Sequence, residues 1–106
     1  MTDAKETLLL DAGRILAGLR QPMTAEETQR FARKAINQAA LIEREPERFE
    51  AICGMIQPEL TPRGALPHQI EMIGQAVLYT LDQTRSLKQA RAILGAMWSG
   101  ALIVKN

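Results

Sequence analysis

The longest apolar stripe in the sequence occupies its last third, and it limits the fold more than any other feature. Its members recur at near-heptad spacing, which places them on one face of a helix. They are Leu66, Ile70, Ile73, Val77, Leu81, Thr84, Leu87, Leu94 and Trp98. Ser86 offers a second helix start and Arg91 interrupts the stripe, so two helices joined near residue 85 are an alternative. Because no proline or glycine stands at that join, the pattern favours one long helix over residues 67–99.

Three further helices are predicted upstream, over residues 4–18, 24–44 and 46–56. Each carries apolar residues at helical spacing. Thr24 and Glu27 stand three residues apart at the start of the second helix, as in a capping box, where each side chain accepts a backbone N–H. The predicted fold class is therefore all-α, a small helical bundle.

Two segments lack a helical pattern. Three prolines and one glycine fall within QPELTPRGALP, which predicts a loop over residues 57–66. Residues 101–104 read ALIV, and this composition favours a short C-terminal strand within an extended tail over residues 101–106. At this length, residues 1–106 are expected to form a single helical domain.

Composition and charge narrow the function classes. Hydrophobic residues make up 46% of the chain, which is enough for a folded core. Thirteen Lys and Arg against twelve Asp and Glu leave a formal charge of +1, which argues against direct binding of nucleic acid. The single Cys53 permits no internal disulfide, and the uncharged stretch 92–104 is too short to cross a membrane, which takes about 20 residues. We expect a cytoplasmic protein without membrane contact.

The sequence holds no pattern of catalytic residues. His68 is the only histidine, so no histidine-based metal motif is present. The glycines do not follow the spacing of phosphate-binding loops, and neither serine lies in a nucleophile elbow. Cys53 lies on an apolar stripe and is expected in the core. These observations predict a protein that is not an enzyme and needs no metal or cofactor.

The long stripe also predicts self-association. A chain of this size offers too few helices to cover a helix over residues 67–99, and a two-fold pairing of two copies would bury the remainder. The predicted homodimer interface consists of Ile70, Ile73, Val77 and Leu81.

Trp98, near the end of the same predicted helix, has two interpretations. A large ring with an N–H donor suits either the core or a surface that docks another protein, where tryptophan is a frequent anchor. The predicted partner face consists of Met97, Trp98, Leu102, Ile103 and Val104.

A basic stripe has two interpretations as well. Arg85, Lys88 and Arg91 fall three apart and share one side of the predicted helix. Without companion aromatic residues, the stripe fits an acidic patch on a protein better than it fits DNA.

The order of features resembles that of the small quorum-sensing antiactivators of the TraM and QslA types. The matching segments are, in chain order, LAGLRQPMTAEET, KAI, EREPERFEAI, PHQIEMIGQAV and ILGAMW. Together with the apolar tail they span residues 16–106. The chain departs from the pattern by an additional helix over residues 4–18 and by Arg91 within the long stripe.

The resemblance implies a helical homodimer that binds a LuxR-type, acyl-homoserine-lactone-responsive transcription activator of the LasR-like kind. Binding would be at the ligand-binding domain and would block the activator's dimerisation or DNA binding. Such a protein needs no catalytic group. The alternatives are a small DNA-binding or nucleoid-associated protein and a dimeric adaptor module.

Overall fold

Five α-helices and one 3₁₀ turn make up the computed structural model. It describes the backbone of residues 4–42, 44–84 and 86–104, and the side chains of residues 8–42, 44, 46–84, 86–96 and 98. The elements are α1 (Ala4–Ala17), α2 (Ala25–Ala40), α3 (Glu45–Leu60), η1 (Thr61–Arg63), α4 (Pro67–Gln83) and α5 (Leu87–Val104). No strand occurs in these described ranges, and the predicted all-α class is confirmed.

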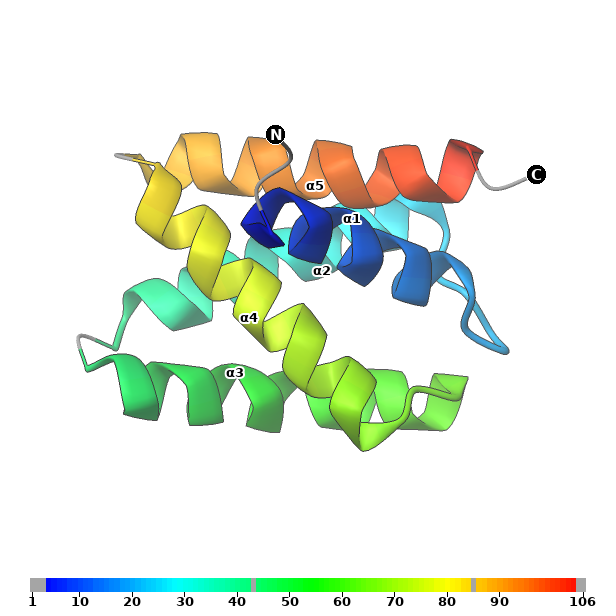
Figure 1. Cartoon of the computed structure of the whole chain (residues 1–106), viewed down its shortest axis with the longest axis horizontal. Helices are drawn as coiled ribbons and strands as arrows, with labels where there is room; N and C mark the ends of the chain where they lie inside the picture. The colour runs from blue at the N-terminus through cyan, green and yellow to red at the C-terminus, as the bar shows by residue number, and fades with distance from the viewer. Residues whose placement is uncertain (1–3, 43, 85, 105–106) are drawn as a thin grey trace.

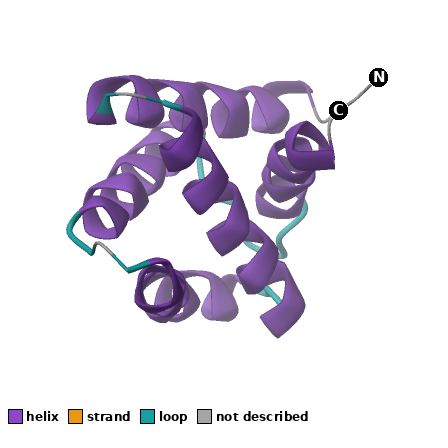
Figure 2. Cartoon of the chain, turned by 60° about the vertical axis from the view of Figure 1, so that its left-hand side comes forward, coloured by secondary structure: helices purple, strands orange, loops and turns teal. Residues whose placement is uncertain are grey.

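The helix α4 runs through the middle of the bundle and contacts each of the other four α-helices. In Figure 1, α5 lies along the top, α3 lies along the bottom, and α4 crosses between them. The contacts of α5 are most extensive with α2 and α1, which lie on two sides of it. Turned by 60°, the bundle again shows α4 at the centre with the other helices around it (Figure 2).

Each helix contributes an apolar face to a shared core. The helix α2 has the clearest pattern, because its buried residues recur every three or four positions. They are Thr28, Phe31, Ala32, Ala35, Ile36 and Ala39. Each large aliphatic side chain that is fully buried contributes about 1.5–3 kcal/mol. Those side chains are Leu16, Ile36, Ile52, Ile56, Leu60, Ile73, Val77 and Leu94.

The start of α2 confirms the predicted capping box. Thr24 Oγ1 accepts a hydrogen bond from the backbone N–H of Glu27 at 3.1 Å, and Glu27 Oε1 accepts one from the N–H of Thr24 at 2.9 Å. Two backbone donors that the helix itself leaves without partners are satisfied in this way. The helix ends at Ala40, earlier than the predicted end at residue 44.

The predicted single helix over residues 67–99 is wrong, because the chain breaks it into α4 and α5. Thr84 has an extended backbone (φ −118°, ψ 149°), which ends α4. Ser86 Oγ accepts the backbone N–H of Gln89 at 3.4 Å, as the residue before a helix does. The chain reverses at this break (Figure 1), so residues from both halves of the apolar stripe reach the core of one chain, while Leu66 and Leu87 stay exposed.

The predicted loop over residues 57–66 is mostly helical. The helix α3 continues to Leu60 with Pro58 inside its last turns, so it is longer than the predicted helix over 46–56, and η1 follows directly. Pro67 occupies the first turn of α4. Backbone N–H groups in the first turn have no partner within the helix, so the missing N–H of proline costs no helical hydrogen bond there. The turn itself falls on Gly64, whose φ of 106° is accessible to glycine without strain.

The predicted strand and extended tail over residues 101–106 are wrong as far as the chain is described. The helix α5 continues through Val104. Helical hydrogen bonds satisfy backbone groups that a strand would have to pair with a second strand. Residues 105 and 106 lie outside the described part.

Replacing Gly54 and Gly74 with alanine is expected to change the stability of the fold in opposite directions. Gly54 is exposed within α3, and a Cβ built there meets nothing within 4 Å. Gly54→Ala is expected to raise the free energy of unfolding by about 0.5–1 kcal/mol, because alanine loses less backbone entropy in a helix. At Gly74 a Cβ would lie 3.2 Å from both Cys53 Sγ and Phe49 Cε1. Gly74→Ala is therefore expected to lower stability by about 1 kcal/mol through overpacking.

Urea denaturation followed by circular dichroism measures both variants. An increase in stability for Gly74→Ala equal to that for Gly54→Ala would contradict the close approach of α3 and α4.

Candidate functional site

The predicted dimer interface lies inside the subunit's own core. Ile70, Ile73 and Val77 are 6%, 0% and 0% exposed, and the half-buried Leu81 packs against the same core. The stripe is buried because α4 is the central helix and every other α-helix contacts it. The assignment of Ile70, Ile73 and Val77 to a dimer surface is therefore wrong for this fold, and the assignment of the half-buried Leu81 stays a prediction.

Trp98 is a core residue, and its placement on an exposed partner face is also wrong. The side chain is fully buried, and its ring centroid lies 6.0 Å from that of Phe31 on α2. The indole N–H makes no hydrogen bond to any residue that the structure describes. An aromatic pair of this kind joins α2 to α5 and leaves no ring surface for a partner. The side chains of Met97, Leu102, Ile103 and Val104, the rest of the predicted partner face, lie outside the described residues.

Trp98→Ala is expected to destabilise the fold by about 3–5 kcal/mol, since it removes a fully buried aromatic side chain. As a control, Leu41→Ala removes a side chain that is 77% exposed and should change stability by less than about 0.5 kcal/mol. Urea denaturation measures both. The intrinsic fluorescence of the native protein gives a second readout, because Trp98 is the only tryptophan. Emission and acrylamide quenching typical of an exposed indole would contradict the buried position.

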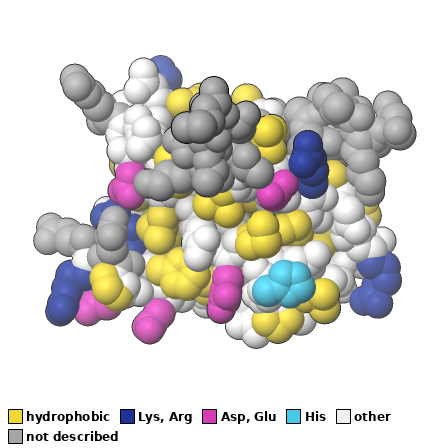
Figure 3. All heavy atoms as spheres, in the orientation of Figure 1, with side chains coloured by type: hydrophobic (Ala, Val, Ile, Leu, Met, Phe, Trp, Pro, Cys, Tyr) yellow, Lys and Arg dark blue, Asp and Glu magenta, His cyan; other side chains and the backbone are white. Residues whose placement is uncertain are grey.

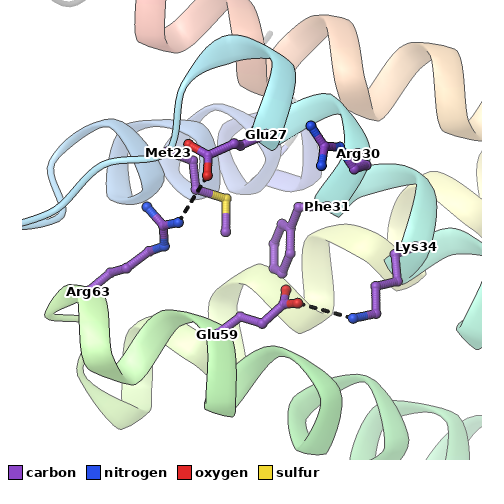
Figure 4. A pocket seen from close by; sticks show the side chains of 7 residues that line it. All are labelled: Met23, Glu27, Arg30, Phe31, Lys34, Glu59 and Arg63. Carbon is purple, nitrogen blue, oxygen red and sulfur yellow. Dashed lines mark hydrogen bonds and ion pairs between the residues drawn. The ribbon is translucent and has the colours of Figure 1, made fainter.

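A charged pocket lies between α2 and the end of α3 (Figure 4). It has a volume of about 350 Å³, and two ion pairs flank its apolar floor. In one, Arg63 Nη2 lies 3.3 Å from Glu27 Oε2, and in the other Lys34 Nζ lies 3.0 Å from Glu59 Oε1. The lining residues are Met23, Glu27, Arg30, Phe31, Lys34, Glu59 and Arg63.

The ion pairs of this pocket link chain segments that are far apart in the sequence. Arg63 Nη1 also donates to the backbone oxygen of Gln21 at 3.0 Å, and the N–H of Gln21 donates to the oxygen of Arg63 at 3.1 Å. Arg63 thus fastens η1 to the segment before α2, while Lys34 and Glu59 join α2 to α3. Because four of the five charged residues that line the pocket form these links and Arg30 pairs with Glu26 within α2, the pocket is best explained as part of the scaffold.

The pKa of Glu27 is lowered from its ordinary value of 4.5. The backbone N–H of Thr24 that donates to its carboxylate is the main cause, partial loss of water opposes it, and Arg63 adds a smaller attraction. A carboxyl group with a lowered pKa in the folded state stabilises the fold fully above pH 4.5, and this contribution is lost as the pH falls through the folded pKa.

Glu27→Gln is expected to lower stability at neutral pH, with the difference from the wild type shrinking below pH 4.5. Glutamine keeps an acceptor for the Thr24 N–H but loses the charge. Glu26→Gln is the matched control, because it removes the same charge one residue away, where the carboxylate is 86% exposed. Chemical denaturation from pH 3 to pH 7 measures the effect, and equal pH profiles for the two variants would refute it.

An apolar patch occupies the junction of α1, α4 and α5. It surrounds a hollow of about 320 Å³ lined by Leu9, Leu10, Tyr79, Thr80, Gln83, Thr84 and Ile93. Two of its large side chains stay well exposed, Leu10 at 46% and Ile93 at 42%. In the view of Figure 3, hydrophobic side chains gather across the middle of the molecule, with isolated acidic side chains among them. The patch is suited to contact with another apolar surface and holds no catalytic arrangement.

Sequence reasoning missed this patch, although a signal for it exists. Leu8, Leu9 and Leu10 are consecutive, and successive residues of a helix point about 100° apart. Three consecutive leucines therefore cannot all face one core. Leu9 is buried, Leu8 is half-buried, and Leu10 projects outward.

The basic stripe is only partly described, because Arg85 lies outside the described residues. Lys88 and Arg91 line a groove between α2 and α5, where Arg33 of α2 joins them. Its other lining residues are Gln29, Ala92, Gly95 and Ala96, and its volume is about 350 Å³. Basic residues 55 and 58 positions apart in the sequence thus form one surface, which the sequence pattern of α5 alone does not reveal.

Groups suited to chemistry are sparse in the described part of the chain. Cys53 is half-buried against the core, as expected, and burial followed by the nearby Glu71 charge raises the pKa of its thiol. A thiol with a raised pKa is a weak nucleophile at neutral pH. Among the residues described, His, Cys, Asp and Glu nowhere gather in a group of three that could hold a metal ion.

Comparison with known proteins gives no match: no protein-family model fits the sequence, and neither a curated protein nor a solved structure is similar to the chain. Within the described residues, no helix is both long enough and apolar enough to span a membrane.

Proposed function

We propose that this chain is a quorum-sensing antiactivator, a binding protein that occupies the ligand-binding domain of a LuxR-type, LasR-like transcription activator. The sequence resemblance supplies the identity of the partner. The observation that supports a binding role is the apolar patch at the junction of α1, α4 and α5, with Leu10 and Ile93 exposed on it. This patch takes the place of the predicted partner face around Trp98.

The chemistry of the patch suits protein recognition. Exposed leucine and isoleucine side chains lie beside the half-buried ring of Tyr79, and Gln83 and Thr84 supply a polar edge. An apolar centre with a polar rim is the usual composition of a protein–protein interface. Helices held against a rigid core present such a surface in a fixed shape, so little ordering entropy opposes binding.

The proposed mechanism is competition for a surface. A LuxR-type activator pairs with itself to bind two DNA half-sites. A protein that binds the activator's self-pairing surface withdraws it from the active dimer by mass action. No bond is made or broken in this mechanism, so the protein needs no catalytic group and no cofactor.

Leu10→Ala and Ile93→Ala are each expected to weaken binding to the ligand-binding domain by about tenfold, as for apolar anchors near the centre of an interface. The measurement is isothermal titration calorimetry against the purified ligand-binding domain of a LasR-like receptor, loaded with its acyl-homoserine lactone. Leu41→Ala is the matched control, because Leu41 is the most exposed of the large apolar side chains described and does not line the patch.

Light scattering on the same mixtures shows whether complex formation reduces the receptor's self-dimers, and on the free protein it measures self-association. Two species that stay separate would refute the antiactivator proposal. If Leu41→Ala weakens the complex as much as Leu10→Ala does, the partner would be correctly identified, but the apolar patch would not be the binding surface.

A further inference from the structure

The groove between α2 and α5 concentrates positive charge. Arg33 comes from α2, and Lys88 and Arg91 come from α5. No Asp or Glu is among its described lining residues. The groove therefore carries three positive charges on a chain whose formal net charge is only +1.

Five basic residues elsewhere on the described surface are paired with carboxylates, whereas Arg20 and Arg48, like the three cations of the groove, take part in no ion pair. Arg14, Arg30, Lys34, Arg44 and Arg63 each lie within 4 Å of a carboxylate. In the described part of the chain, neither Arg33 nor Lys88 takes part in an ion pair. Arg91 Nη1 donates at 2.7 Å to the neutral amide oxygen of Asn37. The groove thus keeps its charge available to an external anion.

Small residues of α5 line the groove together with the basic ones. Ala92 and Ala96 are exposed, lie one helical turn apart, and line the hollow beside the buried Gly95. With such short side chains, another helix can approach the α5 backbone closely. Arg33, Lys88 and Arg91 line the same hollow, where they would meet carboxylates on the incoming helix.

We propose that the α2–α5 groove is a docking site for an acidic amphipathic helix of a partner protein. The positive charge of the groove selects glutamate- or aspartate-rich partners, and its small α5 residues select a helix over a bulkier structure. A nucleic-acid duplex fits this groove less well. Proteins bind its phosphate backbone with basic side chains, and the alanines of the groove make no favourable contact with phosphates. The site is separate from the apolar patch and does not depend on the identity of the partner there.

The test uses fluorescence anisotropy with a labelled, helix-forming peptide of about 18 residues, since shorter helices are marginal in water. The peptide carries glutamate along one face and leucine and alanine on the other, and a second peptide replaces each glutamate with glutamine. The full-length protein is expected to bind the glutamate peptide at low ionic strength and to bind the glutamine peptide at least about tenfold more weakly.

Two variants with equal loss of charge locate the site. The double variant Arg33→Gln, Lys88→Gln should weaken binding of the glutamate peptide by about tenfold, as expected for two partly screened charge contacts. The double variant Arg14→Gln, Arg44→Gln removes two exposed charges outside the groove and should leave binding unchanged. Ala92→Trp, which fills the groove at an exposed position without changing charge, should weaken binding by a similar factor to the groove double variant.

Three outcomes would overturn the proposal. Equal weakening by the two double variants would mean that net charge alone attracts the peptide. Full binding by a correctly folded Ala92→Trp variant would mean that no helix enters the groove. Binding of a labelled DNA duplex that the groove double variant abolishes, with no binding of the peptide, would make the groove a nucleic-acid surface. None of these outcomes bears on binding of the LuxR-type receptor, which is measured separately.

Discussion

The contact between α2 and α5 is the interaction on which the rest of the structure depends. It is the most extensive contact in the bundle, and it joins segments that are far apart in sequence. The ring of Trp98 packs against Phe31, and Arg91 donates to Asn37 further along the same pair of helices. A Cβ built at Gly95 would lie 3.7 Å from Gln29 Cγ and 3.8 Å from Gln29 Cα, in ordinary van der Waals contact, so the two helix backbones approach closely at this point.

This contact requires the break between α4 and α5. If residues 67–99 formed one straight helix, the half that includes Trp98 would extend away from α2, and its apolar residues would be exposed to water. The extended backbone of Thr84 lets the chain reverse, so the stripe folds back on itself and reaches the core twice. Most of a stripe that suggests a second copy when placed on a straight helix is therefore covered within one chain, and Leu66 and Leu87 remain exposed.

Local chemistry was readable from the sequence, and the packing of distant segments was not. The capping box of α2 is predictable because it depends on two side chains three residues apart and on backbone groups beside them. The break at Thr84 is hard to predict because neither proline nor glycine marks it, and Ser86, a possible helix start, is its only local signal. The helical structure within residues 57–66 is hard to predict because proline can begin a helix as well as end one.

The two candidate surfaces also combine local features that the sequence predicts with long-range contacts that it does not. That Leu8, Leu9 and Leu10 cannot all be buried follows from helix geometry, but only the fold shows that Leu10 meets Ile93 of α5 at one hollow. The pairing of Arg33 with Lys88 is likewise a property of the α2–α5 contact. Trp98 allowed two interpretations from its chemistry alone, and its burial against Phe31 decides between them.

Helix geometry explains why one helix serves both surfaces. Ala90, Leu94 and Trp98 recur every fourth residue along α5, are fully buried, and fix its rotation about its own axis. With that row facing the core, Lys88, Ala92 and Ala96 come to lie on the side of α2, and Ile93 comes to lie on the side of α1. A rotation of α5 by one residue, about 100°, would bury Lys88 or expose Trp98. The residues that stabilise the core therefore also determine which side chains are offered to partners on either side of α5.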